Sequence, residues 1–286
     1  MNKIVAIQAD ALNSINVKTD TTLLIALEAQ KRFYQIYWYQ TKDLSLINGK
    51  VYAKAKKVKF FENTKNFYKV SKTIKLNLAK AKFILIRQNP PFNMDYITST
   101  LYLENLTKKV KVLNNPFSIR NISEKFYSVN FLNFMPPTIF TKDLKIIKDF
   151  YNKNKKIVIK PIHGYAGKDI LFIEKNFNKQ KINKYINKIG HVMIQKFLPL
   201  IKYGDKRVFI LNGKVKGAIR RKPLKGSILS NISQGGSALK TKLNKKEMRI
   251  SKSIAVKLKK NKIFFAGIDL VSNYLIGDIN VTSPTG

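Results

Sequence analysis

The chain has 286 residues, and its 55 lysines and arginines against 16 aspartates and glutamates give a formal net charge of +39. This length accommodates two or three packed subdomains, and the 44% hydrophobic content supports a sizeable core, which excludes wholesale disorder. The absence of cysteine excludes disulfides, thiolate zinc sites, iron–sulfur clusters and a cysteine nucleophile, and only two histidines remain for imidazole chemistry.

The basic charge is spread along the chain and forms no single stripe. Lysine-rich runs recur at residues 56–59, 108–111 and 257–262, and only seven of the basic residues are arginines. Lysine accompanied by abundant asparagine and isoleucine indicates a compositional bias, so we interpret the charge as a solvated surface and expect no nucleic-acid partner. No apolar run approaches the roughly 20 residues of a membrane span, and residues 1–8 lead into a strand-like segment instead of a signal peptide. We therefore expect a soluble, cytoplasmic protein without a membrane partner.

The first 121 residues alternate between strand-like and helix-like patterns. Asp20 begins an amphipathic pattern typical of a capped helix. Strands that alternate with helices predict a parallel α/β layer. The alternating segment at residues 51–60 is typical of a solvent-facing hairpin inserted into that layer. Strands are expected at residues 3–8, 36–39, 82–87 and 110–113, and a second helix at about 95–108.

The remaining residues predict an α+β arrangement in two further parts, 122–200 and 201–286. The first part holds a predicted helix near 124–131 and predicted strands at 156–160, near 170 and near 192. The second holds paired strands at 206–211 and 214–220, a helix at 244–260, and two strands that end in Asp269 and Asn280.

A glycine-containing turn follows the predicted strand at residues 155–161. Residues 163–168, His-Gly-Tyr-Ala-Gly-Lys, join this strand to another strand. Such a turn can lie over the phosphates of a nucleotide, because its backbone N–H groups bind phosphate oxygens and its lysine adds positive charge. Lys160 would present an ammonium at the same end of the sheet. An ordinary hairpin and an ordinary strand-end lysine are the alternatives, since the pattern matches neither glycine motif that opens a helix.

Three oxygen-bearing side chains end the last two predicted strands. Asp278 and Asn280 share one face of their strand, because side chains alternate along a strand. If the two strands pair as a hairpin, Asp269 lies across from them. Two carboxylates and an amide oxygen form the hard ligand set that Mg²⁺ takes when it also bridges phosphates. A solvent-facing hairpin with turn-forming residues is the alternative.

The scarce arginines gather just upstream of these strands. A planar guanidinium binds oxyanions and carboxylates through two parallel hydrogen bonds, so arginines near a phosphate site suit such groups. Ordinary surface charge is the alternative interpretation. The polar set comprises Asp205, Arg207, Arg220, Arg221 and Asn231, followed by Gly235 and Gly236.

Several ordered segments resemble a known family. They are LINGK at 46–50, RQNPPF at 87–92, NISEKFY at 121–127, IVIKPIHGYAGKDI at 157–170, QKFLPLIKYGDKRVFI at 195–210, AGIDLV at 266–271 and DINVTSPTG at 278–286. Over nearly its whole length the chain resembles prokaryotic glutathione synthetase, of the ATP-grasp superfamily.

The resemblance implies a fold and an activity. An N-terminal parallel α/β, or pre-ATP-grasp, domain at 1–121 would precede a two-part ATP-grasp domain. Its small subdomain at 122–200 would carry a phosphate flap, and its large subdomain at 201–286 a metal site. The implied activity is ATP-dependent ligation of γ-L-glutamyl-L-cysteine to glycine through an acyl phosphate, with Mg²⁺ or Mn²⁺, in a homotetramer.

The resemblance also implies roles for individual residues. Lys125 and Lys160 would contact the phosphates of ATP, and Arg207 and Arg221 would neutralise the acyl phosphate. The phosphate flap would comprise His163, Gly164, Tyr165, Ala166 and Gly167. Gln195, Lys196, Phe197 and Leu198 would line the adenine pocket, with backbone groups of the last two reading the base, and Asp205 would lie near the ribose. Arg87, Asn231, Gly235 and Gly236 would seat the peptide substrate, and Asp269, Asp278 and Asn280 would hold two magnesium ions.

The chain departs from the family pattern in four ways. His163 and Ala166 replace an acid and a glycine of the flap, and Ala166 restricts the flap if this position needs a positive φ. Asp278 replaces a longer glutamate, and Leu229 replaces an arginine. The family continues past this point with a helical tail of about 25–30 residues, whereas this chain stops at Gly286. These departures leave two alternatives open: an ATP-grasp ligase for another carboxylate–amine pair, and a truncated or degenerate protein that binds nucleotide without turnover.

Overall fold

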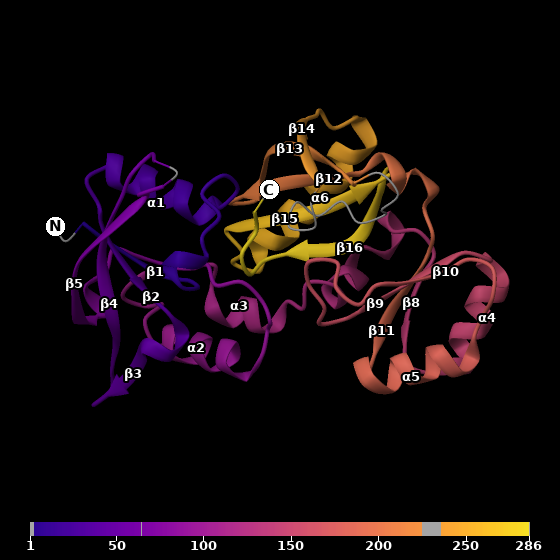
Figure 1. The fold of residues 1–286 in the computed structure, drawn as a ribbon, viewed down its shortest axis with the longest axis horizontal. Helices are drawn as coiled ribbons and strands as arrows, with labels where there is room; N and C mark the ends of the chain where they lie inside the picture. The colour runs from indigo at the N-terminus through magenta and orange to yellow at the C-terminus, as the bar shows by residue number, and fades with distance from the viewer. Residues whose placement is uncertain (1–2, 64, 225–235, 286) are drawn as a thin grey trace. The chain divides into compact units, whose positions relative to one another are not determined.

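A computed structural model describes residues 3–63, 65–224 and 236–285 (Figure 1). The chain divides into two compact units. Unit 1 comprises Met1–Asn121, Leu258–Ala266 and Val281–Gly286, and unit 2 comprises Ile122–Lys257 and Gly267–Asn280. Two late segments therefore belong with the N-terminal residues. The division of residues 122–286 into small and large subdomains stays a prediction.

Unit 1 is built around a seven-stranded sheet with the order β3-β4-β2-β1-β6-β7, and β5 pairs with β4. The chain builds outward from β1 through β2 and then crosses to β6 on the other side. The carboxyl ends of β1 and β6 therefore form the point where the strand order reverses, which is where open α/β sheets bind ligands. The parallel strands are β1 (Ile4–Gln8), β2 (Gln35–Tyr39), β6 (Phe83–Ile86) and β7 (Lys111–Leu113), which confirms the predicted parallel layer.

Helices cover both faces of this sheet, because its central strands carry apolar side chains on both faces. Leu23 of α1 packs in one core cluster with Val5 and Ile7, whereas Tyr96 of α2 packs in another with Ala6. The side chain of Asp20 accepts a hydrogen bond from the backbone N–H of Leu23 at 2.9 Å, which confirms the predicted helix start. The helices are α1 (Thr21–Lys31), α2 (Met94–Glu104) and α3 (Pro116–Asn121), and Figure 1 shows α1 on one side of the sheet and the other two on the opposite side.

The alternating segment predicted at residues 51–60 is part of β4, and it continues the main sheet. Ala53 and Ala55 are buried, whereas Lys54 and Lys56 are exposed, so the alternation marks a strand with one face in the core. The antiparallel strands on this side are β3 (Leu44–Ile47), β4 (Lys50–Phe60) and β5 (Tyr68–Asn77), and β4 pairs with β2, β3 and β5.

Unit 2 begins with a four-stranded antiparallel sheet in the order β10-β9-β11-β8. A cluster that includes Ile147, Ile157 and Ile182 joins this sheet to α4 and α5. The elements are β8 (Thr138–Thr141), α4 (Leu144–Asn154), β9 (Ile157–Pro161), β10 (Leu171–Ile173), α5 (Lys179–Ile189) and β11 (Val192–Lys196).

The helix predicted near residues 124–131 differs from the observed element. The structure has a 3₁₀ helix at Phe126–Phe134, with a non-helical φ of −135° at Phe131. Aromatic and β-branched residues and asparagine dominate this segment, and all of them have low α-helix propensity.

A third sheet, distinct from the seven-stranded and four-stranded sheets, has the order β14-β13-β12-β15-β16. Its last two strands pair antiparallel, which is the hairpin pairing that the metal-site hypothesis required, with Gly267 opposite Asn280. The elements are β12 (Asp205–Leu211), β13 (Lys214–Lys222), β14 (Ser237–Lys240), α6 (Lys245–Lys260), β15 (Phe265–Val271) and β16 (Tyr274–Asn280).

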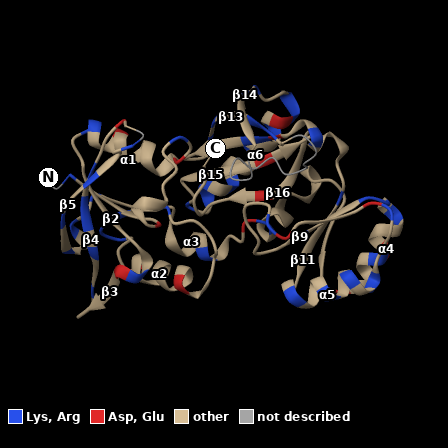
Figure 2. Cartoon of the chain, in the orientation of Figure 1, with Lys and Arg blue, Asp and Glu red and all other residues tan. Residues whose placement is uncertain are grey.

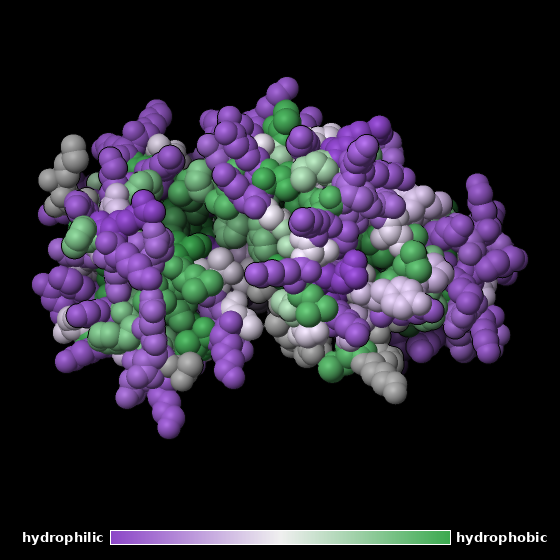
Figure 3. Space-filling view, turned by 90° about the horizontal axis from the view of Figure 1, so that it is seen from above, coloured by the Kyte–Doolittle hydropathy of each residue, from purple (hydrophilic) through white to green (hydrophobic). Residues whose placement is uncertain are grey.

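Lysine and arginine are distributed over elements of both units, with few acidic residues between them (Figure 2). Hydrophilic side chains project over the face seen in Figure 3, and apolar side chains lie recessed between them. Within the described ranges, no helix is both long enough and apolar enough to cross a membrane.

Candidate active site

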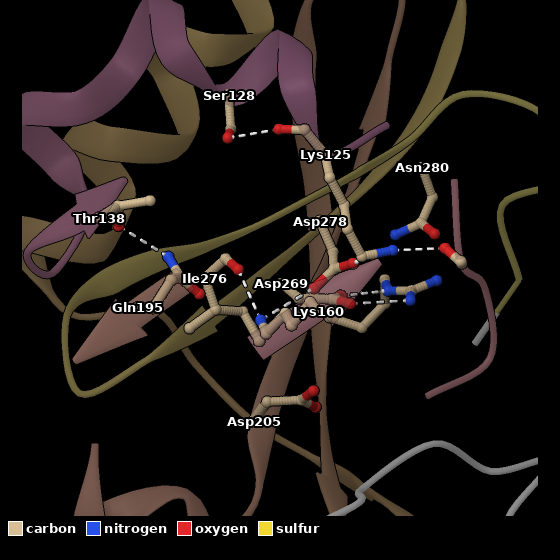
Figure 4. A network of polar contacts seen from close by, with 12 residues as sticks. Lys125, Ser128, Thr138, Lys160, Gln195, Asp205, Asp269, Ile276, Asp278 and Asn280 are labelled. Atoms are coloured by element: carbon tan, nitrogen blue, oxygen red, sulfur yellow. Dashed lines mark hydrogen bonds and ion pairs between the residues drawn. The ribbon is translucent and has the colours of Figure 1, made fainter. Parts of the chain in front are cut away.

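Two lysines of unit 2 converge on one aspartate (Figure 4). Lys160 lies near the end of β9, Lys125 directly precedes the 3₁₀ helix, and Asp278 belongs to β16. The Nζ atom of Lys125 lies 3.4 Å from Oδ1 of Asp278, and Nζ of Lys160 lies 3.5 Å from Oδ2. These separations are longer than the about 2.7–2.9 Å of a strong charge-assisted hydrogen bond. Both ammonium groups are therefore close to the carboxylate without being tightly bound to it.

Each lysine is anchored by a backbone carbonyl. Nζ of Lys125 donates a hydrogen bond to the carbonyl oxygen of Gly164 in the glycine turn. Nζ of Lys160 donates to the carbonyl oxygen of Ile276 at 2.8 Å. Because an ammonium has three N–H donors, each lysine keeps donor capacity for the oxygens of a ligand.

Burial and charge act together on the ionisation of this cluster. Burial lowers the pKa of Lys160, and the nearby Asp278 only partly offsets this effect. Burial alone would raise the pKa of Asp278, but Lys125 and Lys160 outweigh it and lower that pKa below its ordinary value. The carboxylate of Asp278 is therefore ionised at neutral pH.

A second buried cluster joins two arginines to two aspartates. Nε and Nη2 of Arg207 donate to Oδ1 and Oδ2 of Asp269 at 2.5 and 3.0 Å. Nη2 of Arg221 lies 2.8 Å from Oδ2 of Asp269. Nε and Nη2 of Arg221 also donate to Oδ1 and Oδ2 of Asp205 at 2.8 and 2.5 Å. Each guanidinium is thus fixed by a bidentate carboxylate, which limits its rotation.

The same contacts shift the ionisation of the second cluster. Burial alone would raise the pKa of Asp269, but the two arginines outweigh it and lower the pKa to about 2. Burial likewise opposes the charge of Arg221, yet Asp269 and Asp205 raise its pKa above the ordinary value. Asp269 and Arg221 are therefore both charged at neutral pH.

Glycines make room for this arrangement. A Cβ atom on Gly267 would lie 2.9 Å from Cδ of Arg207, so glycine lets the arginine cross β15 toward Asp269. Gly277 has a φ of +88°, and a Cβ there would lie 2.7 Å from Sδ of Met193. Gly277 directly precedes Asp278 in β16. It belongs to the irregular part of the β15–β16 pairing, where the register shifts between Ile268 and Leu270 of β15. Sequence reasoning missed the role of Gly277, although a glycine directly before a predicted ligand was an available signal.

The predicted metal ligands include two carboxylates and one amide. Asp278 and Asn280 are both partly exposed on β16, whereas Ile279 between them is buried, which confirms that the two share a face. Nδ2 of Asn280 donates to the carbonyl oxygen of Gly267 at 3.3 Å. Among the described residues, no three His, Cys, Asp or Glu side chains converge to hold a metal. Carboxylate and amide oxygens are nevertheless the type of donor that Mg²⁺ takes in proteins.

The glycine turn joins two strands, β9 and β10, as the sequence predicted, and these strands pair antiparallel. Ala166 and Gly167 both have a positive φ, of 53° and 75°. Ala166 therefore adopts the left-handed conformation at the position where the family pattern has glycine. The side chain of His163 is exposed, and Nζ of Lys168 lies 4.9 Å from the centre of the Tyr165 ring.

Four residues are predicted to line the adenine pocket. Gln195 and Lys196 end β11, and Phe197 and Leu198 connect this strand to the next turn. Nε2 of Gln195 donates to Oγ1 of Thr138 at 3.0 Å, so this side chain is directed toward β8 (Figure 4). The backbone N–H of Phe197 donates to the carbonyl oxygen of Lys156 at 2.9 Å. The carbonyl oxygen of Leu198 accepts from a backbone N–H in the following 3₁₀ turn. Base reading by these backbone groups stays a prediction.

Arg87 lies in unit 1, directly after β6 at the reversal of strand order. Its Nε donates to Oγ1 of Thr22 at 3.1 Å, and its Nη2 donates to the carbonyl oxygen of Pro284 at 3.0 Å. Burial lowers the pKa of Arg87 to about 10. Its Nη1 is buried without a hydrogen-bond partner in the described part of the chain, which suits an anionic group of a ligand.

Three further residues predicted to contact the peptide substrate lie within or directly after residues 225–235, which the structure does not describe. Asn231 and Gly235 fall outside the described residues, as does Leu229. Gly236 is described and directly precedes β14. Their predicted roles with the peptide substrate stay predictions.

Solved structures with the same fold define the class of this protein. The chain is similar to a D-cycloserine synthetase, with a TM-score of 0.69 and 13% identity over 98% of this chain and 92% of that one. It is also similar to the ATP-grasp ligase PsnB in complex with a minimal precursor, with a TM-score of 0.62 and 14% identity over 99% and 91% of the two chains. The chain therefore has an ATP-grasp fold.

Sequence comparison narrows the class to one family. Residues 4–120 match the N-terminal domain of prokaryotic glutathione synthetase, and residues 124–286 match its ATP-grasp domain. The chain is 35% identical to a glutathione synthetase of Bradyrhizobium diazoefficiens, over 99% of this chain and 90% of the relative. It is 37% identical to one of Buchnera aphidicola subsp. Baizongia pistaciae, over 96% and 87% of the two chains. The chain belongs to the prokaryotic glutathione synthetase family, whose members are ATP-dependent ligases.

Proposed function

We propose that the chain joins γ-L-glutamyl-L-cysteine to glycine with ATP, which yields glutathione, ADP and phosphate. Family membership over both domains supports this reaction. The observation that carries it at the site is the convergence of Lys125 and Lys160 on Asp278, beside the carbonyl group of Gly164. In this reaction the substrate carboxylate takes the γ-phosphoryl group of ATP, and the amine of glycine then displaces phosphate from the acyl phosphate.

The two lysines are suited to bind the phosphates of ATP. Their contacts with Asp278, at 3.4 and 3.5 Å, are loose enough to be exchanged for phosphate oxygens. The backbone carbonyls that accept from Lys125 and Lys160 would hold the ammonium groups in place during this exchange. Positioned positive charge is the main protein contribution to phosphoryl transfer.

Mg²⁺ or Mn²⁺ is proposed at Asp269, Asp278 and Asn280. When bound there, the metal would neutralise phosphate charge as a Lewis acid. Asp278 is the more available carboxylate, because guanidinium groups already contact both oxygens of Asp269 at 2.5–3.0 Å. The fit to Mg²⁺ rests on the oxygen donor set described above.

Arg207 and Arg221 are proposed to stabilise the negative charge of the acyl phosphate. Both guanidinium groups are fixed in advance by Asp269 and Asp205, so little reorganisation accompanies charge development. Arg87 is proposed to bind a carboxylate of the peptide substrate through Nη1.

Other proposed roles rest on the family resemblance. Residues 163–167 would cover the phosphates, residues 195–198 would contact the adenine, and Asp205 would lie near the ribose. Because both oxygens of Asp205 accept hydrogen bonds from Arg221, Asp205 is also proposed to position that arginine. A cytoplasmic location remains a prediction from the sequence, and a homotetramer remains an expectation from the family resemblance.

The test is ATP-dependent phosphate release with Mg²⁺, in which γ-glutamylcysteine plus glycine is compared with each substrate alone. We expect release to require both substrates and glutathione to be identified by mass. If phosphate is released only with another carboxylate–amine pair, the protein ligates different substrates from those proposed. Nucleotide binding without release for any pair would support a non-catalytic protein.

Asp278→Asn provides the matching test of the site. We expect ligation to fall at least a hundredfold, because the variant removes charge from the proposed metal ligand. Asp149→Asn is the control, since Asp149 is an exposed residue of α4 and the substitution is the same. Near-normal turnover of Asp278→Asn would show that Asp278 is not a ligand.

A further inference from the structure

We propose that Asn114 is a positioning residue that fixes the spacing of the two strands carrying the proposed metal ligands. Asn114 lies between β7 and α3 in unit 1 and has no proposed contact with substrate. The inference rests on the proposed metal site at Asp269, Asp278 and Asn280.

The amide of Asn114 uses its full hydrogen-bonding capacity on the two strand ends. Its Nδ2 donates to the carbonyl oxygens of Phe265 and Val281 at 2.7 and 2.6 Å. Its Oδ1 accepts from the backbone N–H groups of Phe264 and Phe265 at 2.9 and 2.8 Å. A primary amide offers two donors and two acceptor lone pairs, so every one of them is occupied. The side chain is also buried, at 4% exposure, where unmet bonds are most costly.

These contacts lie at the start of β15 and just past the end of β16. Phe265 is the first residue of β15, two positions before Gly267, and Val281 directly follows Asn280. Gly267 and Asn280 are paired across the two strands. The amide therefore bridges the strands immediately beside the pair that contains a proposed metal ligand.

The β15–β16 ladder by itself fixes this end of the two strands weakly, although β15 also pairs with β12 on its other side. Beyond the Gly267–Asn280 pair the ladder has one further pair, Ile268 with Ile279, before the register shifts. Two pairs next to an irregularity constrain register less than a long regular ladder does. The bridge from Asn114 adds four hydrogen bonds at the open side of these two pairs. Without it, we expect the oxygen donors of β15 and β16 to lose their fixed separation.

The test uses Asn114→Ser, which is uncharged and too short to bridge both strands, and Asn114→Asp, which has nearly the same shape but loses both donors. Ile119→Ala is the control, because it removes a buried side chain of α3 in the same unit. Mn²⁺ affinity is measured by electron paramagnetic resonance with a non-hydrolysable ATP analogue bound, and the affinity for the analogue is measured without metal. We expect both Asn114 variants to weaken Mn²⁺ binding at least tenfold while analogue affinity changes less than twofold. The Ile119→Ala control should bind Mn²⁺ with unchanged affinity, even if its melting temperature falls as far as those of the Asn114 variants.

Mn²⁺ affinity within twofold of the parent in folded Asn114→Ser, or an equal loss in the control, would overturn the inference. Asp278→Asn in the same titration separates the two proposals. If Asp278→Asn abolishes Mn²⁺ binding and the Asn114 variants do not, the positioning role alone fails. If Asp278→Asn binds Mn²⁺ normally, the proposed metal site itself fails.

Hydrogen exchange of the unaltered protein tests the same coupling without a variant. Coupling between two sites is reciprocal, so a metal that depends on the bridge must also stabilise it. We expect Mn²⁺ with the analogue to slow exchange of the backbone amides of Phe264 and Phe265 at least threefold beyond the analogue alone. Unchanged exchange at these amides would contradict the role of Asn114, even if neither variant folds.

Discussion

Gly204→Ala is expected to disrupt the buried pair of Arg221 and Asp205. Gly204 directly precedes β12 with φ 96° and ψ 174°. This region of backbone conformation is essentially restricted to glycine, and another residue there costs about 1–3 kcal/mol. A Cβ would also lie 2.1 Å from the carbonyl oxygen of Arg221, which is backbone and cannot rotate away.

The size of the effect follows from this contact. Moving from 2.1 Å to an ordinary contact of 3.4 Å requires β12 and β13 to separate by roughly 1.3 Å. The bond of 2.8 Å from Nε of Arg221 to Oδ1 of Asp205 would then stretch to roughly 4 Å, beyond hydrogen-bond range. Loss of a hydrogen bond to a charged group costs about 1.5–3 kcal/mol. The two effects together predict a loss of about 2.5–6 kcal/mol in the free energy of unfolding.

Gly190→Ala is the matched control, because Gly190 has a φ of +86° with no atom within 4 Å of an added Cβ. Its expected loss is only the about 1–3 kcal/mol of backbone strain. Urea unfolding of both variants measures the stability difference, and steady-state ligation measures the consequence for Arg221. We expect kcat to fall at least tenfold in Gly204→Ala and to stay near normal in Gly190→Ala. Equal stability losses with normal kcat in both would refute the reasoning.

Three further predictions concern the same site. The pKa of Asp269 is lowered to about 2, so its ionised form contributes about 2 kcal/mol of stability. This contribution is complete above about pH 4 and is lost as pH falls toward 2. Urea unfolding from pH 6 to 2 should show a smaller acid-dependent loss in Asp269→Asn, and equal losses would contradict the assignment. Lys160→Met should keep the fold, since burial already disfavours the charge, but should weaken binding of an ATP analogue at least tenfold. An unchanged affinity would remove Lys160 from the phosphate site. Gly277→Ala should lower the free energy of unfolding by about 2–6 kcal/mol through its φ and its contact with Met193. Adding Met193→Ala should not recover the φ component, and full recovery would show that the side-chain contact alone was responsible.

Local patterns in the sequence predicted the elements that local physics determines. Alternation placed Asp278 and Asn280 on one face of a strand, and the capping pattern at Asp20 marked the start of α1. The parallel order of the N-terminal strands also followed from their alternation with helices. Side-chain period and cap chemistry operate within a few residues, which explains why a single sequence reveals them.

The arrangement of charges at the site required non-local information. Asp205 was expected near the ribose by resemblance, yet the structure joins both of its oxygens to Arg221. This contact depends on the register of β12 with β13, which pairs Asp205 with Arg221. The helices α4 and α5 were not predicted, although Asp143 and Asn178 cap them and both carry amphipathic patterns. In that case the signal was present in the sequence.

The discontinuous course of unit 1 has a consequence for biosynthesis. The amide of Asn114 bonds to Val281, which is synthesised 167 positions later. At about 5–20 residues per second, translation takes roughly 8–30 s to cover that distance. During this interval the polar groups of Asn114 and Arg87 that later bind the C-terminal segment remain hydrated on the nascent chain. The N-terminal residues of unit 1 therefore cannot complete their native hydrogen bonding before residues 281–284 have been synthesised.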